Sequence, residues 1–99
     1  MDLNLKCSAF LAIDAAATEY GVTVKDIFSD VRLREVSEAR HAAMAVVVES
    51  VGYSYVEAGR FFGRDRASII YAVNKVHDLA SVERRTRRHI EAIKAAIGK

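Results

Sequence analysis

Apolar residues in the first part of the chain recur at helical spacing. Four of them stand three or four positions apart between residues 3 and 20: Phe10, Ile13, Ala17 and Tyr20. This is the period of one face of an α-helix. Gly21 follows and can end the helix in a left-handed conformation. The pattern therefore predicts a first helix over residues 3–20.

Two further helices are predicted before the middle of the chain. Residues 24–29 form a helical turn that is too short to be stable without packing. Residues 30–36 are a charged connection, and Ser37 is a candidate N-cap for a helix that runs to about Val51. Four residues of that helix can share an inward face: Ala43, Val46, Val47 and Ser50.

The next segment predicts two helices joined by a tight turn. Ser54 is expected to cap a short helix over residues 55–62, and Asp65 is expected to cap the helix that follows the turn. The short helix has four candidate inward residues: Tyr55, Ala58, Gly59 and Phe62. The second helix has an apolar stripe at helical spacing: Ile69, Ala72, Val73 and Val76.

Ser81 is the candidate cap of a last amphipathic helix over residues 81–97. Its apolar residues align on one side: Ile90, Ile93 and Ile97. Zero prolines and five glycines in 99 residues favour helices over a many-stranded fold. We therefore expect one compact all-α domain over residues 1–99, with a helical extension at 1–16, a core at 17–79 and a C-terminal helix.

Composition places the chain among soluble globular domains, because 52% of its residues are hydrophobic and 28% are charged. No apolar run approaches the roughly 20 residues needed to cross a bilayer, and the first residues do not resemble a signal peptide. The single cysteine, Cys7, cannot form an internal disulfide and is expected to be a small buried side chain. These observations predict a cytoplasmic protein.

Positive charge is concentrated in the last part of the chain. Residues 60–99 hold ten basic and four acidic residues, a net charge of +6, whereas residues 1–59 sum to −4. A basic half in a small protein favours a polyanion partner, although a solvated helical surface has the same composition. The second interpretation applies above all to four arginines of the last helix: Arg84, Arg85, Arg87 and Arg88.

Two short helices joined by a glycine-containing turn are typical of a helix-turn-helix, whose second helix enters the major groove of DNA. Five residues form the N-terminal tip of that helix here: Arg64, Asp65, Arg66, Ala67 and Ser68. Arginine can bridge two acceptors of guanine, aspartate accepts from cytosine, and alanine contacts the thymine methyl. Tyr71, further along, is a candidate groove-facing side chain. The pattern predicts a double-stranded DNA-binding site.

Residues 17–79 also resemble a known family, the C-terminal DNA-binding domain of the bacterial replication initiator DnaA. The resemblance begins at ATEYGVTVKDIFS, continues through SEARHAAMAVVVESVGYSYVEAGRFFG, and is strongest in GRDRASIIYAVNKV. It implies an all-α DNA-binding domain in which Arg32 enters the minor groove and Arg40 makes a second DNA contact. It also implies that the tip at residues 64–68 reads bases and that Lys75 lies near a phosphate.

The chain departs from the family pattern at several positions. One glycine, not two, precedes Arg64, and Arg66-Ala67-Ser68 replaces a His-Thr-Thr triplet. The connection before the central helix is less basic than in the family because it contains Asp30 and Glu35. Each altered base contact changes discrimination by about 1–3 kcal/mol. We therefore expect a base preference different from that of the family.

The expected function is a stand-alone, DnaA-like DNA-binding protein that regulates replication initiation or transcription and associates with the nucleoid. The sequence contains no GxxxxGK[ST] phosphate loop, and His41, His77 and His89 lack metal-ligand spacing. We accordingly expect no enzyme activity, cofactor, metal, membrane or small-molecule substrate. Two alternatives stay open. One is a module that binds the initiator or its regulators through Phe61 and Ile70, and the other is a Trp-repressor-like homodimer.

Overall fold

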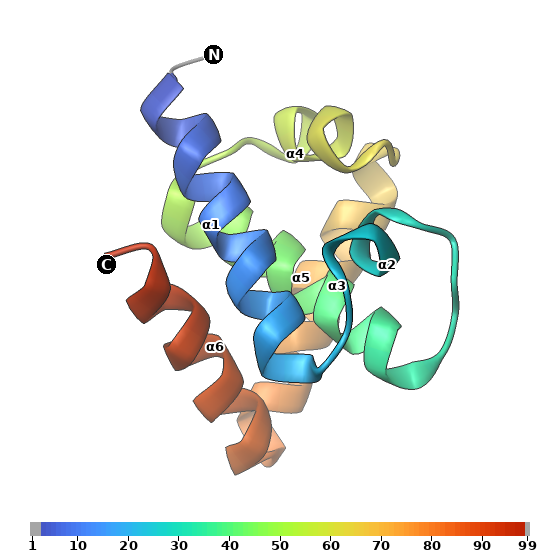
Figure 1. Ribbon diagram of the computed structural model, residues 1–99. Helices are drawn as coiled ribbons and strands as arrows, with labels where there is room; N and C mark the ends of the chain where they lie inside the picture. The colour runs from blue at the N-terminus through green and yellow to red at the C-terminus, as the bar shows by residue number, and fades with distance from the viewer. Residues whose placement is uncertain (1–2, 99) are drawn as a thin grey trace.

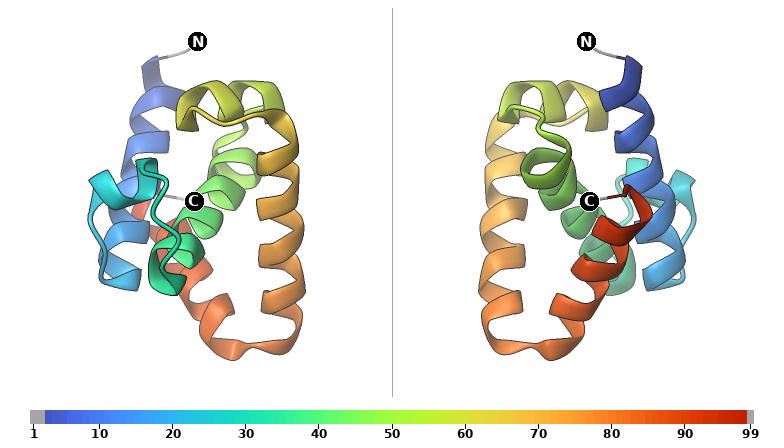
Figure 2. Two further views of the ribbon diagram at one scale, coloured as in Figure 1. Left: turned by 90° about the vertical axis from the view of Figure 1, so that its right-hand side faces the viewer. Right: turned by 90° about the vertical axis from the view of Figure 1, so that its left-hand side faces the viewer.

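The computed structural model describes residues 3–98, which form helices and no strand. In chain order the elements are α1 (Leu3–Tyr20), α2 (Val24–Phe28), α3 (Arg34–Val46), the π-helical turn η1 (Val47–Val51), α4 (Tyr55–Phe62), α5 (Arg66–Val82) and α6 (Arg84–Ala96). Figures 1 and 2 show α3 in the middle of the molecule, with α1 beside α6 and with α5 on another side. The all-α prediction is confirmed.

The core gathers around α3, which packs against α1, α2, α5 and α6. Its largest fully buried side chains come from most of the elements: Ile13, Ile27, Met44, Val46, Val47, Ile69 and Ile93. Burial of each such aliphatic side chain stabilises the fold by about 1.5–3 kcal/mol. No helix in the described part of the chain is long and apolar enough to cross a membrane.

The buried stripe of α1 consists mainly of alanines, and this corrects the predicted inward face. The buried positions are Ala9, Ala12, Ile13, Ala16 and Ala17. Phe10 is 50% exposed and Tyr20 is partly buried. The small residues let α1 lie close to its neighbours, which turns Phe10 to the edge of the core, where its ring meets Phe61 at a centroid distance of 5.1 Å. Residues 3–16 are thus part of one continuous, packed helix.

The central helix begins at Arg34 with Leu33 as its N-cap, four residues earlier than predicted, so Ser37 is not its N-cap. Val36 is buried, which draws the first turn into the fold, and Arg34 pairs with Glu38 at 3.4 Å across one helical turn. The helix does reach Val51, but its last turn is π-helical. Gly52 ends it with φ of 103°, a left-handed conformation that favours glycine.

The last predicted cap is also wrong, because α5 continues through Ser81 to Val82. The Ser81 hydroxyl donates to the Asp78 carbonyl at 2.7 Å inside the helix, so it is not available to cap the next one. The chain reverses at Glu83, and α6 follows directly. Ile93 and Ile97 are buried as predicted, and Ile90 is partly buried.

Two further side chains lie outside the core against expectation. Cys7 is exposed because it precedes the buried Ala9 by two positions and so lies on the opposite side of α1. Tyr55 occupies the first position of α4 and is exposed, so the buried face of that helix begins at Ala58.

Candidate nucleic-acid interface

The helix-turn-helix is built by two capped helix starts. Ser54 Oγ accepts from the Glu57 amide at 3.0 Å, and Glu57 Oε1 accepts from the Ser54 amide at 2.9 Å. Asp65 Oδ1 accepts from the Ser68 amide at 2.8 Å at the start of α5. This hydrogen bond lowers the pKa of the Asp65 carboxyl, which is therefore ionised at neutral pH. Both caps confirm the sequence prediction.

The turn between α4 and α5 approaches α4 so closely that only glycine fits at position 59. A Cβ at Gly59 would lie 2.6 Å from the Arg64 carbonyl oxygen. The Arg64 amide donates to the Gly59 carbonyl at 2.8 Å, which holds the turn against the helix. Gly63 takes the left-handed conformation at the end of α4, with φ of 69°. The direction in which α5 leaves the turn is thereby fixed.

An open groove of about 490 Å³ lies between α3, the α2–α3 connection and the start of α5. We call residues 30–33 the arm and residues 64–68 the tip. The left view of Figure 2 looks toward this side of the molecule, with the arm and α5 on either side of α3. The predicted site residues that line the groove are Arg32, Arg40, Arg64, Asp65, Ala67, Ser68 and Tyr71.

The two other predicted residues lie next to the groove. Arg66 is an exposed residue of the tip. Lys75 is exposed on α5 and lines an adjoining hollow together with Arg32 and Arg34. The fold thus brings together residues that are more than forty positions apart in the sequence, as Arg32 and Lys75 are.

Arg40, a predicted DNA contact, lines the groove, and its side chain is also hydrogen-bonded inside the protein. Its side chain is only 4% exposed. Its Nε donates to the Ile27 carbonyl at 2.8 Å, and the two hydrogens of its Nη2 are shared among three more backbone carbonyls, those of Asp26, Ser29 and Val31, at 3.0, 2.7 and 3.0 Å. Burial, and then the charge of Arg64, lowers the pKa of Arg40. Because these donors hold the α2–α3 connection, they are committed inside the protein.

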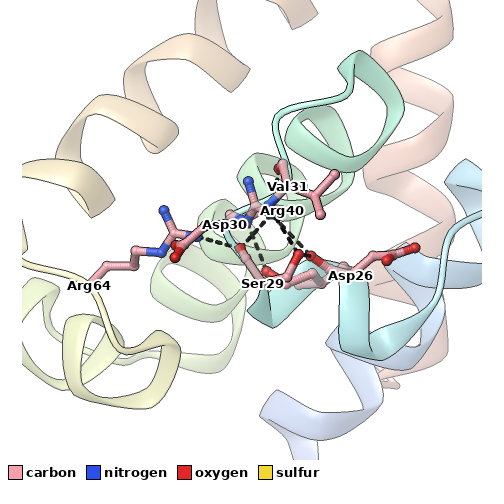
Figure 3. A network of polar contacts seen from close by, with 7 residues as sticks. Asp26, Ser29, Asp30, Val31, Arg40 and Arg64 are labelled. Atoms are coloured by element: carbon pink, nitrogen blue, oxygen red, sulfur yellow. Dashed lines mark hydrogen bonds and ion pairs between the residues drawn. The ribbon is translucent and has the colours of Figure 1, made fainter.

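Arg64 joins the tip to the same connection. Its Nη2 donates to the Ser29 carbonyl at 2.6 Å and lies 3.4 Å from Asp30 Oδ1. The Ser29 carbonyl therefore accepts from two guanidinium groups that come from different elements, as Figure 3 shows. This carbonyl links the start of the arm to the turn before α5.

His41 belongs to the groove and was missed at the sequence level. Its ring lies 5.7 Å, centroid to centroid, from that of Tyr71, which is 58% exposed. Burial lowers the pKa of His41, and the nearby charges of Arg40 and Lys75 lower it further, so the imidazole is neutral at neutral pH. The helical spacing could have indicated this position, because His41 follows Ser37 by one turn of α3 and both residues line the groove.

The residues considered for a protein-binding patch or a metal site do not form a second site. Phe61 is partly buried among the rings of Phe10, Phe28, Tyr53 and Phe62, and Ile70 is partly buried as well. The exposed apolar patch expected from these two residues is therefore not formed. In residues 3–98, no group of three or more His, Cys, Asp or Glu side chains could hold a metal ion.

The arginines of α6 lie away from the tip. Arg85 is 3.6 Å from Glu38, and Arg87 Nη1 donates to the Ala80 carbonyl at 2.6 Å near the end of α5. Arg84 and Arg88 are exposed. None of the four lines the groove.

Comparison with known proteins places these features in a family. The family model described as the bacterial dnaA protein helix-turn-helix matches residues 11–76. The chromosomal replication initiator protein DnaA of Bartonella quintana (strain Toulouse) is 34% identical over 85 residues, which are 85% of this chain and 17% of that protein. The DnaA of Streptococcus pyogenes serotype M5 (strain Manfredo) is 37% identical over 79 residues, which are 79% of this chain and 18% of that protein. The chain spans less than a fifth of the length of these relatives.

Proposed function

This chain belongs to the bacterial DnaA helix-turn-helix family, a family of DNA-binding domains, and from that premise we propose that it binds double-stranded DNA through the groove between arm and tip. The observation that carries the proposal is that Arg32 and the tip residues line one open groove, although they lie on different elements.

In the proposed complex the start of α5 enters the major groove. Arg66 is the exposed arginine of the tip and can bridge two acceptors on guanine, while Ser68 accepts or donates as the base requires. Arg32, exposed on the arm, inserts into the adjacent minor groove. Lys75, about two turns further along α5 than Ser68, neutralises a phosphate without reading sequence.

The proposed role is to occupy duplex sites and so regulate replication initiation or transcription. In this role, occupancy of a site follows from the concentration of the chain and its affinity for that site. This proposed role implies that the protein is cytoplasmic and associated with the nucleoid.

A salt titration tests the proposal. A duplex obtained by in-vitro selection is labelled, and its binding is followed by fluorescence anisotropy between 50 and 200 mM salt. The logarithm of the association constant should fall linearly with the logarithm of salt, by about 0.9 for each neutralised phosphate. Indifference of the purified chain to duplexes at low salt would contradict the proposal.

Substitutions then separate base reading from phosphate contact. Arg66→Ala should weaken the selected duplex by about 1–3 kcal/mol and relax its preference over other sequences. Lys75→Ala should weaken all duplexes alike and reduce the salt slope by about 1. Arg88→Ala removes the same charge from the exposed face of α6 and serves as the control. Equal losses on all sequences for Arg66→Ala would remove its base-reading role.

A further inference from the structure

The α2–α3 connection is held by a buried charge. All four acceptors of the Arg40 guanidinium are backbone carbonyls. Two belong to α2, a helix of five residues that is too short to be stable alone. The other two belong to Ser29 and to Val31, the residue directly before Arg32. Planar arginine, with five donors in a fixed fork, can satisfy several carbonyls at once, whereas lysine offers a single flexible charge.

These hydrogen bonds fix the backbone that presents Arg32. The Val31 carbonyl is held by Arg40, and the Val31 amide donates to Ser29 Oγ at 3.2 Å. Ser29 Oγ in turn donates to the Asp26 carbonyl at 2.6 Å. The residue before Arg32 is therefore held at both its amide and its carbonyl, while the Arg32 side chain itself is exposed.

The Ser29 carbonyl also connects the arm with the tip. Arg40 reaches it from α3 at 2.7 Å, and Arg64 reaches it from the turn before α5 at 2.6 Å. The two segments that flank the groove are thus tied to one peptide group. A shift of that peptide moves the arm relative to the tip and changes the distance between the two DNA-facing parts.

We propose that Arg40 is a positioning residue that, together with Arg64, holds the arm at the place and angle from which Arg32 reaches the minor groove while the tip occupies the major groove. In this proposal Arg40 acts through the arm and not through a DNA contact of its own, because its Nε and Nη2 are engaged by backbone carbonyls. The expected effects on DNA binding rest on the proposed function. The position of the arm, however, can be measured without DNA.

The decisive variant is Arg40→Lys, which keeps the charge and removes the fork. Its matched control is Arg34→Lys, because Arg34 lies on the same helix with a side chain that is 72% exposed. Arg40→Lys should lower the affinity for the selected duplex roughly 5- to 150-fold, as expected for loss of one base contact. The salt slope should stay unchanged, since no phosphate contact is lost. The charge-removing variant Arg40→Gln should keep the salt slope too; a slope reduced by about 1 in that variant would show that Arg40 binds phosphate and would overturn the proposal.

A double-mutant cycle tests whether Arg40 acts through Arg32. Once Arg32→Ala has removed the arm contact, Arg40→Lys should cost no further affinity. Additive losses in the double variant would show that the two residues act independently, against the proposal.

Amide hydrogen exchange in the DNA-free protein separates this inference from the proposed function. Arg40→Lys should speed exchange at Val31, whereas the core amides of Ile69 and Ile93 should keep their protection. Unchanged exchange at Val31 would contradict the positioning role even if DNA binds. If Arg40→Lys does not fold, Ser29→Ala removes the hydroxyl that holds the Val31 amide, and the same arm-specific change is expected. Equal exchange at Val31 in that variant and in the wild type would count against the proposal.

Discussion

The two sides of the molecule are held together by different kinds of contact. Where α1 and α6 pack on the core, the buried side chains are almost all apolar: Ala9, Ala12, Ile13, Ala16, Ala17, Ile93 and Ile97, with Thr86 as the polar one. Around the groove, guanidinium groups on carbonyl oxygens hold the arm and the turn in place. Apolar contacts are non-directional and depend on area, whereas hydrogen bonds depend on geometry.

This difference separates stability from recognition. Loss of apolar volume on the α1–α6 side should lower the free energy of unfolding and leave the groove intact. A change on the groove side should alter the placement of a few side chains at a smaller cost in stability. The predictions that follow test this separation, beginning with the largest effect.

Ile93→Ala is expected to have the largest effect on stability. Ile93 is fully buried on α6, so its truncation leaves a cavity in the core. The free energy of unfolding in urea should fall by about 2–5 kcal/mol. The folded fraction should bind DNA with unchanged affinity, because Ile93 does not line the groove. Weaker binding by fully folded protein would show that the two sides are coupled.

Gly59→Ala should affect both stability and recognition, because Gly59 lies at the junction of α4 and the tip. The added Cβ would meet the Arg64 carbonyl oxygen at 2.6 Å, and since that atom is backbone the turn itself has to move. Overpacking of this kind costs about 1–3 kcal/mol. Urea unfolding and the affinity for the selected duplex should both decline.

Ala95→Gly is the control for this variant. Ala95 is exposed on α6, so the change costs about 1 kcal/mol through helix propensity alone. It should leave DNA affinity unchanged. Equal loss of affinity in both variants would mean that general destabilisation, and not the position of the tip, weakens binding.

The sequence predicts the local features of this fold well. The buried stripe of α5 and the caps at Ser54 and Asp65 follow from residue spacing and from short-range hydrogen bonds. Ser37 and Ser81 have the same residue type as Ser54 but cap nothing, because buried Val36 extends α3 and because α5 continues past Ser81. A cap is therefore predictable from its type only where packing does not move the end of the helix.

The arrangement of the groove was predictable only in part. The tip follows from the helix-turn-helix pattern, and Arg32 follows from the family resemblance. The partners of Arg40 could not be predicted, because backbone carbonyls carry no residue-specific signal and the four acceptors are brought together only by the fold. For the same reason, the spacing of residues along the sequence does not reveal that Arg64 and Arg40 share the Ser29 carbonyl.

Asp30→Asn is expected to have a smaller effect, on DNA affinity alone. The Asp30 side chain is 99% exposed and lies 3.4 Å from Arg64. In the proposed complex it would compete with a DNA phosphate for that guanidinium. Its removal should raise affinity by up to about fivefold, in line with the 0.2–1 kcal/mol typical of exposed ion pairs. The gain should fade as salt screens the charges.

Asp14→Asn makes the same change of net charge on α1, away from the groove, and controls for Asp30→Asn. It should raise affinity much less in the same anisotropy titration. An equal gain from both substitutions would mean that net charge, rather than the contact with Arg64, sets the affinity.

His41→Gln tests the smallest expected effect, which is the pH dependence of stability and of DNA affinity that comes from a histidine in the groove. The pKa of His41 is lowered from 6.5 by burial and by the charges of Arg40, Lys75 and Arg64, with Glu38 acting in the opposite direction. Above pH 6.5 the His41 ring is mostly neutral in both the folded and the unfolded chain. Below pH 6.5 the unfolded chain takes up the proton before the folded chain does, so the free energy of unfolding decreases as the pH falls through that window.

The variant should lose this part of the pH dependence in urea unfolding compared at pH 7.5 and 5.5. The same proton adds positive charge beside Arg40 and Lys75, where the proposed duplex lies. Acidification should therefore lower the stability of the wild type and raise its DNA affinity together, since bound phosphate favours the charged ring. In His41→Gln both responses should shrink. A decrease in only the stability response would mean that His41 is part of the core and not of the DNA-binding groove.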